Sequence, residues 1–394
     1  MTGHYSLASS TWGQEEIDAI NQVVASGSFT MGARVAKFEE EFSSLVGSKY
    51  SLMVNSGSSA NLALLAALRY RSEPLLSPDD EVIVPAVSWS TTYYPVTQLG
   101  CKLTFVDVDK DSLNIDPKKI ESAITTKTRA IFVVNLLGNP ADWIQIRQIA
   151  DSHNLILIED NCESLGAELE GQNCGTFGIG GTFSTFFSHH ISTMEGGVVA
   201  TSDESLFHAL KSIRAHGWTR DLPDKNHVYN KTGSDWDDLF RFVLPGYNLR
   251  PLEIEAAIGS VQLTKLSNFV DVRRANAEKF VNQVSNFEGI RVQQQNGKSS
   301  WFGFSIIMEG RLKGQRRELI DLLNKAQVVS RPIVTGNFTR NPVIKHLSCS
   351  PIGPLPAADE IHDDGLFVGN HHFDLTKEID LLSQVLEDFK KGSK

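Results

Sequence analysis

The sequence predicts an α/β fold, with a mainly parallel mixed sheet flanked by helices and a smaller α+β domain after it. Short apolar runs alternate with amphipathic stretches through the first two thirds of the chain, which is typical of strands joined by crossover helices. Beyond residue 250, a long helical pattern is followed by a few further strand and helix patterns. We therefore expect a large domain over residues 1–250 and a smaller C-terminal domain over residues 251–394.

The individual elements follow in order along the chain. In the first part, apolar runs predict strands at 50–54, 81–84, 102–107, 130–135, 155–159, 181–187 and 197–201, and helical patterns cover 58–68, 142–153 and 204–215. In the C-terminal part, helices are expected at 251–278 (one or two in succession), 316–326 and 377–390, and strands at 301–307 and 328–331. Ligands of such sheets lie at the carboxyl ends of the strands, so the polar residues after each strand are candidates for a site.

Residues 217–244 interrupt this order. The stretch is polar and contains Pro223, Gly233 and several aspartates. It is too long for a simple connection, so we expect a substrate loop or lid.

The composition argues against several classes of protein. Of 394 residues, 41% are hydrophobic and 21% are charged, which is ordinary for a globular protein. The net charge of −10 argues against nucleic acid or an anionic membrane as the main partner. No apolar run reaches the roughly 18 residues that span a bilayer, and the N-terminus lacks a secretory pattern, so the cytoplasm is expected. The cysteines Cys101, Cys162, Cys174 and Cys349 form no paired pattern, which favours reduced thiols over zinc or disulfides.

A turn of small residues at 55–60 follows one predicted strand and opens a helix. Its sequence, Asn-Ser-Gly-Ser-Ser-Ala, lets the backbone approach an anion, and the start of the helix supplies free N–H groups. The pattern alone also fits a helix cap without a ligand. The glycine-rich residues 175–181 lack the preceding strand of a dinucleotide fingerprint and predict a loop.

Two further strand ends carry residues with possible chemistry. Glu159 and Asp160 end a buried strand, where a carboxylate is costly unless it meets a cation or a strong donor. A protonated ring nitrogen of a cofactor fits this need, and so does a structural salt bridge. Trp89 lies just beyond another strand, where it is either a core residue or a ring that stacks on a planar cofactor.

His189 and His190 follow the predicted strand at 181–187. On an extended segment successive side chains point to opposite faces, so the pair is a poor metal chelator, and no metal is expected. A single histidine that acts as acid and base fits better, because its ordinary pKa lies near neutrality.

Together, and in this order, these segments resemble the sugar-nucleotide aminotransferases, a family of fold-type I pyridoxal-phosphate proteins. The resemblance covers nearly the whole chain and implies the aminotransferase-like fold. It implies that Asp160 meets the pyridine nitrogen, that Glu163 contacts the ring oxygen and that Trp89 stacks on the ring. Further cofactor-binding residues that it implies are Gly57, Ser58 and Ser184 at the phosphate, Ser188, and Asn248, which reaches the cofactor phosphate of the neighbouring subunit in a homodimer.

One departure from the family pattern decides the expected activity. The aminotransferases have a lysine five residues after Ser184 that binds the cofactor covalently, and here that position is His189. No lysine occurs between residues 128 and 210, so pyridoxamine or pyridoxal phosphate is expected to bind non-covalently. The change from lysine to histidine is typical of the family's sugar 3-dehydratases. One branch of these binds an iron–sulfur cluster through cysteines in the loop before residue 246, but residues 217–244 contain no cysteine, so no cluster is expected.

The resemblance therefore implies C3 dehydration of GDP-4-keto-6-deoxy-D-mannose to the 3,6-dideoxy ketone, as in colitose and O-antigen biosynthesis. Ammonia is released, L-glutamate recharges the cofactor, and His189 is the implied acid–base residue. The implied substrate- or glutamate-binding residues are Thr30, Met31, Gly32, His216, Arg220, Arg250 and Arg331. The sequence does not separate residues for the glutamate carboxylates from those for the sugar diphosphate. A sugar aminotransferase, a dehydratase of another nucleotide sugar and a non-catalytic relative stay open as alternatives.

Overall fold

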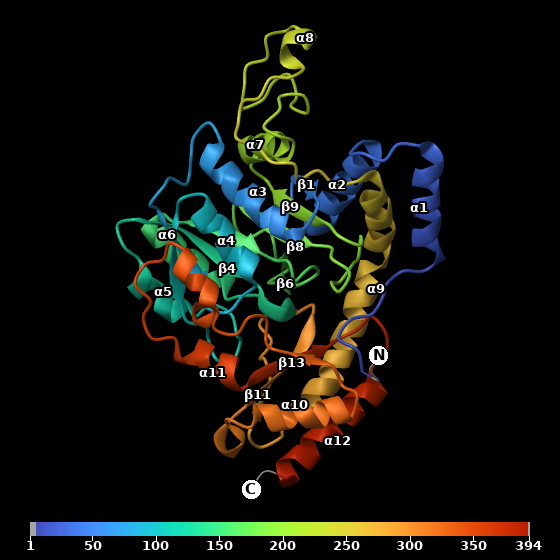
Figure 1. The fold of residues 1–394 in the computed structure, drawn as a ribbon, viewed down its shortest axis with the longest axis vertical. Coiled ribbons are helices and arrows are strands. Elements are labelled where there is room, and N and C mark those ends of the chain that lie inside the picture. Colours follow the sequence, from blue (N-terminus) through green and yellow to red (C-terminus); the bar gives the residue numbers. More distant parts are fainter. Residues whose placement is uncertain (1–4, 393–394) are drawn as a thin grey trace.

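A computed structural model describes residues 5–392, which form a large and a small sheet with helices packed on both (Figure 1). The strands of the large sheet are β1 Tyr50–Val54, β2 Glu81–Pro85, β3 Lys102–Val106, β4 Thr128–Val134, β5 Ile156–Asp160, β8 Gly180–Ser184 and β9 Gly197–Thr201. They lie in the order β1-β9-β8-β5-β4-β2-β3. Strand β9 pairs antiparallel with β1 and β8, and the other four pairings are parallel. The predicted fold class is confirmed, and the carboxyl ends of β2, β4, β5 and β8 lie along one edge.

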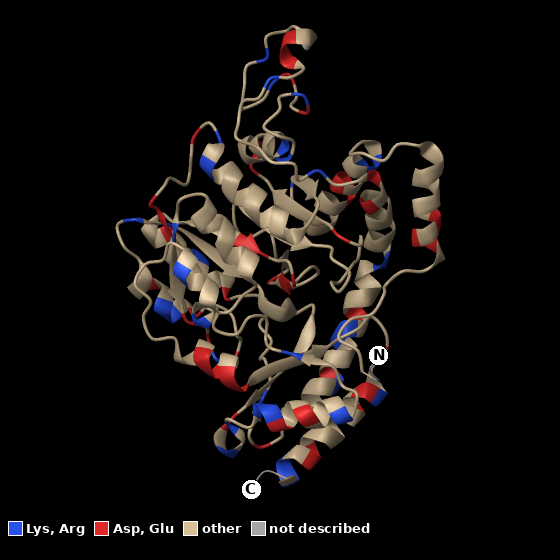
Figure 2. Cartoon of the chain, in the orientation of Figure 1, with Lys and Arg blue, Asp and Glu red and all other residues tan. Residues whose placement is uncertain are grey.

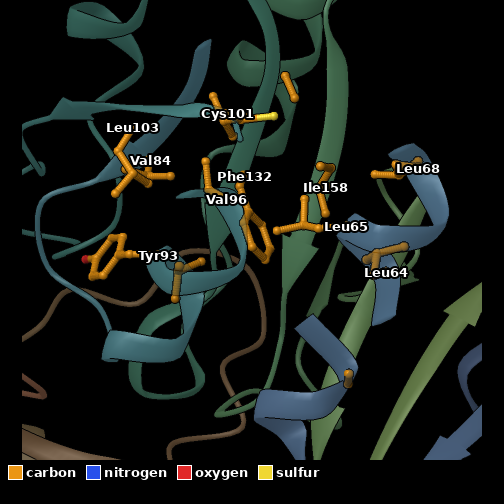
Figure 3. Packing of buried hydrophobic residues seen from close by; sticks show 14 of the residues in the cluster. Leu64, Leu65, Leu68, Val84, Tyr93, Val96, Cys101, Leu103, Phe132 and Ile158 are labelled. Atoms are coloured by element: carbon orange, nitrogen blue, oxygen red, sulfur yellow. The ribbon is translucent and has the colours of Figure 1, made fainter. Parts of the chain in front are cut away.

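Helices α3 (Gly57–Tyr70) and α4 (Ser90–Gln98) pack on the large sheet. Leu64, Leu65 and Leu68 of α3 lie in one buried cluster with Phe132 and Ile158 of the strands (Figure 3). Burial of such a side chain contributes about 1.5–3 kcal/mol. This packing holds the first turn of α3 at the carboxyl edge of the sheet.

The small sheet gathers the C-terminal part of the chain. Its strands, β10 (Ile290–Arg291), β11 (Gly303–Met308), β13 (Gly365–Gly369) and β12 (Ser330–Arg331), are antiparallel. They share a core with α9 (Glu253–Val284), α10 (Arg316–Lys325) and α12 (Thr376–Gly392). Tyr5 also lies in this core and donates a hydrogen bond of 2.6 Å to the carbonyl of Gly369. Tyr5 thus packs on the small sheet, and the boundary at residue 250 stays a prediction.

The remaining elements surround these two sheets. They are α1 Gln14–Ser26, α2 Ala33–Val46, α5 Pro117–Ala123, α6 Trp143–His153, α7 Glu204–Arg214, α8 Asp235–Asp238 and α11 Pro356–Asp364, with a short hairpin of β6 Glu168–Leu169 and β7 Gln172–Asn173. Figure 2 shows charged residues of both signs on the outer helices α9, α10 and α12.

Residues 217–244 form an arm that projects from the large sheet beyond α7, with α8 at its tip (Figure 1). Apolar side chains on the arm face solvent in the single chain, since Trp236 is 81% and Phe240 68% exposed. The stretch is therefore an extended projection and not a lid folded over a cavity.

Two predicted elements have clearly different bounds in the structure, and several elements, α4 among them, were not predicted. Strand β8 ends at Ser184 instead of residue 187, because the chain turns there towards His189. Helix α9 is one continuous helix and extends to Val284. Helix α4 contains Pro95 and three threonines, and its pattern predicted no helix.

Candidate cofactor and substrate site

A cavity of about 570 Å³ lies at the carboxyl edge of the large sheet. Nine residues singled out in the sequence line it: Gly57, Ser58, Trp89, Asp160, Glu163, Ser184, Ser188, His189 and Arg331. They come from helix starts, strand ends and the small domain, so the fold brings together residues that are far apart in the sequence.

The first turn of α3 forms one end of the cavity. Ser56 is the N-cap, and its Oγ accepts the N–H of Ser59 at 3.1 Å. A Cβ on Gly57 would lie 2.6 Å from the Cβ of Ser184, so only glycine allows this close approach of α3 and β8. Backbone N–H groups of a helix start favour an anion, and the neighbouring hydroxyls of Ser58 and Ser184 add polar groups.

Asp160 ends β5 and is 5% exposed. Its Oδ2 accepts hydrogen bonds from Thr92 Oγ1 at 2.7 Å and Asn61 Nδ2 at 2.9 Å, and its Oδ1 accepts the N–H of Cys162 at 3.2 Å. Among the residues that the structure describes, no Lys, Arg or His forms an ion pair with it. The structural salt bridge considered from the sequence is therefore not formed, and a cationic ligand would be well compensated here.

The neighbouring Glu159 points away from the cavity, because successive strand residues face opposite sides. Its carboxylate accepts the N–H groups of Gly175 at 2.6 Å and Gly178 at 2.8 Å. Burial raises the pKa of Glu159 to about 7. This acid therefore holds the glycine-rich loop in place.

Glu163 does line the cavity, and its Oε2 accepts the N–H of Leu137 at 2.9 Å. Burial, with the charge of Asp160 as a smaller cause, raises the pKa of Glu163 to about 7. Its carboxyl group is thus poised between the acid and the carboxylate at neutral pH.

The side chains of His189 and His190 have different surroundings, as expected. The two residues lie on a turn, however, and not on an extended segment. The N–H of His189 donates to the carbonyl of Phe186 at 2.9 Å, and its side chain lines the cavity. Burial, and next the positive charge of Arg273, lowers the pKa of His189 to about 4. The buried His190 instead contacts the carbonyl of Ser300 at 3.0 Å through Nε2.

Trp89 lies at the cavity mouth, 57% exposed, and not in the core. It precedes α4 as the N-cap residue and lines the same cavity as Ser58 of α3 and Asp160 of β5. An exposed aromatic ring beside a buried carboxylate suits a flat, cationic ring system.

The other predicted binding residues lie outside this cavity. They are Thr30, Met31, Gly32, His216, Arg220, Asn248 and Arg250. Glu253 accepts the N–H of Gly32 at 2.8 Å, which fixes the loop before α2.

Four of these residues gather around Trp218 at the base of the arm. The guanidinium groups of Arg220 and Arg250 lie 4.7 and 5.9 Å from the indole ring. The ring of His216 lies 4.9 Å away, and Asn248 Oδ1 accepts from Arg250 Nε at 3.0 Å. The result is a basic cluster on the surface of the single chain.

Two residues of the site were not singled out in the sequence. Asn61 and Thr92 contact Asp160 directly, but an asparagine and a threonine inside helical stretches carry no distinct signal. Asn61 lies four residues after Gly57, on the same face of α3, and this spacing is the one feature that could have indicated it.

The described part of the chain shows no group of three or more histidines, cysteines and acids placed to hold a metal ion. Likewise, none of its helices between residues 5 and 392 is both long and apolar enough to cross a membrane.

A buried acid at a strand end faces a helix start that suits an anion across the carboxyl edge of a mainly parallel sheet, and this arrangement is that of the aminotransferase-like α/β proteins. The sequence profile of the DegT/DnrJ/EryC1/StrS aminotransferase family matches residues 10–385, and the chain belongs to this family.

Individual relatives are similar along their whole length. GDP-4-keto-6-deoxy-D-mannose 3-dehydratase of Yersinia pseudotuberculosis is 50% identical over 386 residues, which cover 98% of either chain. The Escherichia coli GDP-4-keto-6-deoxy-D-mannose-3-dehydratase with bound hydrated PLP has a TM-score of 0.96 at 49% identity and covers 98% of this chain and 100% of its own. A GDP-4-keto-6-deoxymannose-3-dehydratase with a trapped PLP-glutamate geminal diamine has a TM-score of 0.95 at 49% identity, with 97% and 100% covered. The resemblance to the 3-dehydratase branch is confirmed.

Proposed function

We propose that this chain is a pyridoxal/pyridoxamine-phosphate-dependent enzyme that removes the C3 hydroxyl of GDP-4-keto-6-deoxy-D-mannose. The product is GDP-4-keto-3,6-dideoxymannose, ammonia is released, and L-glutamate recharges the cofactor. One observation carries the proposal: His189, and no lysine, lies among the described residues that line a cavity otherwise built for this cofactor. The similarity to two GDP-sugar 3-dehydratases supports the substrate.

The residues present fit the cofactor. Asp160 is a buried carboxylate that accepts hydrogen bonds from neutral donors. The protonated ring nitrogen of the cofactor would therefore compensate its negative charge. Gly57, Ser58 and Ser184 surround the helix start where the phosphate would bind. Trp89 would cover the ring, Glu163 would meet its oxygen, and Ser188, which precedes His189, lines the same cavity.

When bound, pyridoxamine phosphate supplies an amine that joins a keto carbon and a ring that accepts an electron pair. The chain itself supplies proton transfer. With a pKa of about 4, His189 is uncharged at neutral pH and can accept a proton. After this step, its imidazolium can protonate the departing C3 hydroxyl, so one residue serves both transfers.

The basic cluster around Trp218 suits anionic groups on the substrates. We propose that His216, Arg220 and Arg250, with Arg331 in the cavity, bind glutamate carboxylates or the sugar diphosphate. The loop with Thr30, Met31 and Gly32 would contact the nucleotide sugar. Because the cluster lies outside the cavity of its own chain, it would serve the site of a second copy.

We propose a homodimer on these grounds. Asn248 is exposed, and so are several large apolar side chains, among them Trp236 and Phe240 on the arm and Phe29, Phe187, Met194 and Leu252 elsewhere. Exposed apolar groups on this scale are typical of an interface. The cytoplasmic location expected from the sequence stays a prediction.

Labelled nitrogen tests the proposed reaction. The purified protein is incubated with GDP-4-keto-6-deoxymannose, pyridoxal phosphate and ¹⁵N-glutamate, and the products are identified by mass. We expect a nitrogen-free 3,6-dideoxy-4-keto sugar, labelled ammonia in proportion to the sugar consumed, and 2-oxoglutarate.

The same experiment separates the alternatives. A labelled 4-amino sugar that keeps its C3 hydroxyl would indicate an aminotransferase and overturn the proposal. In a separate measurement, a protein that shows no cofactor absorbance above that of the dialysate after dialysis against pyridoxal phosphate would indicate a non-catalytic relative.

A further inference from the structure

Two chains of hydrogen bonds end on the same oxygen of Asp160. In the first, Thr92 Oγ1 donates to Asp160 Oδ2 at 2.7 Å, and the hydroxyls of Ser88 and Thr92 lie 2.8 Å apart. In the second, Asn61 Nδ2 donates to Oδ2 at 2.9 Å, and Thr182 Oγ1 donates to Asn61 Oδ1 at 2.6 Å. All five side chains are buried.

The direction of each bond follows from the number of protons available. A hydroxyl has one proton, and the proton of Thr92 goes to the carboxylate, so Ser88 must donate to Thr92. Asn61 likewise presents its amide hydrogens to Asp160, because its carbonyl accepts the proton of Thr182. Both chains therefore deliver neutral donors to Oδ2.

The other carboxylate oxygen of Asp160, Oδ1, has no such side-chain amide or hydroxyl donor among the described residues. Within residues 5–392, Asp160 Oδ1 accepts one backbone N–H, that of Cys162, at a longer 3.2 Å, and the weakly donating Cys162 thiol also lies against the carboxylate. Since a carboxylate oxygen has two lone pairs, Oδ1 keeps one of them for a donor in the cavity that Asp160 lines.

The helices that carry these donors also carry the rest of the cofactor site. Asn61 lies one turn after Gly57 on α3, and Thr92 lies on α4 just after Trp89. The carboxylate is thus fixed to the two helices whose first turns flank the phosphate and the ring.

We infer that Thr92 and Asn61 are positioning residues, which clamp Oδ2 of Asp160 so that Oδ1 meets the ring nitrogen of the bound cofactor. This inference rests on the proposed function. Neutral donors suit the task because they hold the carboxylate without removing its negative charge, whereas a basic side chain would compete with the protonated ring.

Thr92→Val tests the clamp, because it removes the donor and keeps the shape of the side chain. Thr97→Val is the matched control on the same helix, where the hydroxyl donates only to the carbonyl of Tyr94. Three quantities are measured: the Kd for pyridoxal phosphate by absorbance titration, the pH at which the bound cofactor changes its absorbance, and kcat and KM for the sugar.

For Thr92→Val we expect a Kd about tenfold higher, as one lost hydrogen bond to a charged group implies. The absorbance change should move to lower pH, because the ring nitrogen loses its proton more easily. The value of kcat should fall while KM for the sugar stays unchanged. Thr92→Ser should restore all three quantities, and Thr97→Val should match the wild type.

If Thr92→Val and Thr97→Val behave alike in all three measurements, the clamp is wrong while the proposed function stands. If the wild type itself binds no pyridoxal phosphate, the proposed function fails, and the clamp with it. Should Thr92→Val not fold, Asn61→Leu removes the second donor, and an unchanged absorbance titration in that variant would overturn the inference.

Discussion

His189 lines the cavity, and its imidazole ring has a low affinity for a proton. Its Nδ1 makes no hydrogen bond within the described part of the chain, and burial lowers its pKa to about 4. A base must be uncharged, so the rate constant kcat/KM should fall as pH decreases through about 4 and not near 6.5, the ordinary histidine value.

Replacing this residue should remove turnover and leave binding. His189→Asn keeps a polar side chain of similar size, so the variant should fold and bind pyridoxal phosphate. We expect kcat to fall about 10²–10⁴-fold, the usual contribution of one acid–base group. The measurement is steady-state ammonia release, with cofactor absorbance as the control for binding. Near-normal turnover would move the base to another residue.

Because the pKa of Glu163 is raised in the folded protein, this cavity residue makes the unfolding free energy depend on pH. The folded protein holds the proton up to about pH 7, whereas the unfolded chain releases it near 4.5. Its contribution to stability is therefore fully present below about pH 4.5 and is lost as pH rises through about 7.

Glu163→Gln removes this dependence, because the amide is neutral at every pH and its oxygen can still accept the N–H of Leu137. In the cofactor-free protein, we expect the unfolding free energy of the variant, relative to that of the wild type, to increase from about pH 5 to about pH 8. The increase should be on the order of 1–3 kcal/mol. Thermal unfolding at both pH values measures it. The same difference in Tm at both values would contradict a half-buried Glu163 that titrates near neutral pH.

Among the elements, α3 approaches strand β8 closely through its first turn. The Cβ of Gly57→Ala would lie 2.6 Å from Ser184 Cβ and 2.9 Å from Cys162 Sγ, so helix and strand must separate. We expect a loss of about 1–3 kcal/mol in unfolding free energy and a weaker affinity for pyridoxal phosphate. Gly353→Ala is the control, because its Cβ would meet no atom within 4 Å. Equal stability of the two variants would show that α3 can move without cost.

The sequence predicted elements best where hydrophobic periodicity alone decides them. Strands β1 and β9 coincide with the predicted ranges, and α3 differs by one or two residues at its ends. Helix α4 was missed because Pro95 and the threonines disfavour a helix locally, while packing of the buried Tyr93 and Val96 on the sheet overrides that preference. The end of β8 was missed because a turn, and not a change in polarity, terminates it.

At the scale of the whole molecule, nine of the residues predicted from the sequence line the cavity, but the sequence did not indicate how their side chains contact one another. Asp160 and Gly57 could be found because each ends or begins an element. The hydrogen bonds of Asn61 and Thr92 depend on how α3 and α4 cross the sheet, which no local pattern encodes. In three dimensions, Asn248, which the resemblance assigns to the neighbouring subunit, and Arg250 are both separated from the cavity of their own chain.

That separation makes a sharp prediction about assembly. If each site combines His189 of one subunit with Asn248 of the other, two defective chains can complement each other. In a mixed dimer of His189→Asn with Asn248→Ala, one site carries both defects, and the other has both native residues. The two variants are unfolded and refolded together, and ammonia release is measured at a cofactor concentration too low to saturate Asn248→Ala.

Random pairing makes half of the dimers mixed, each with one native site, so activity should recover to about one quarter of the wild-type value. Each variant refolded alone is the control and should stay below that value, because each of its sites carries a defect. Asn248 is exposed and its side chain bonds only to Arg250, so Asn248→Ala should keep its fold, which circular dichroism checks. Activity of the mixture equal to the average of the two separate variants would mean that each site belongs to one chain, and the composite dimer would be wrong.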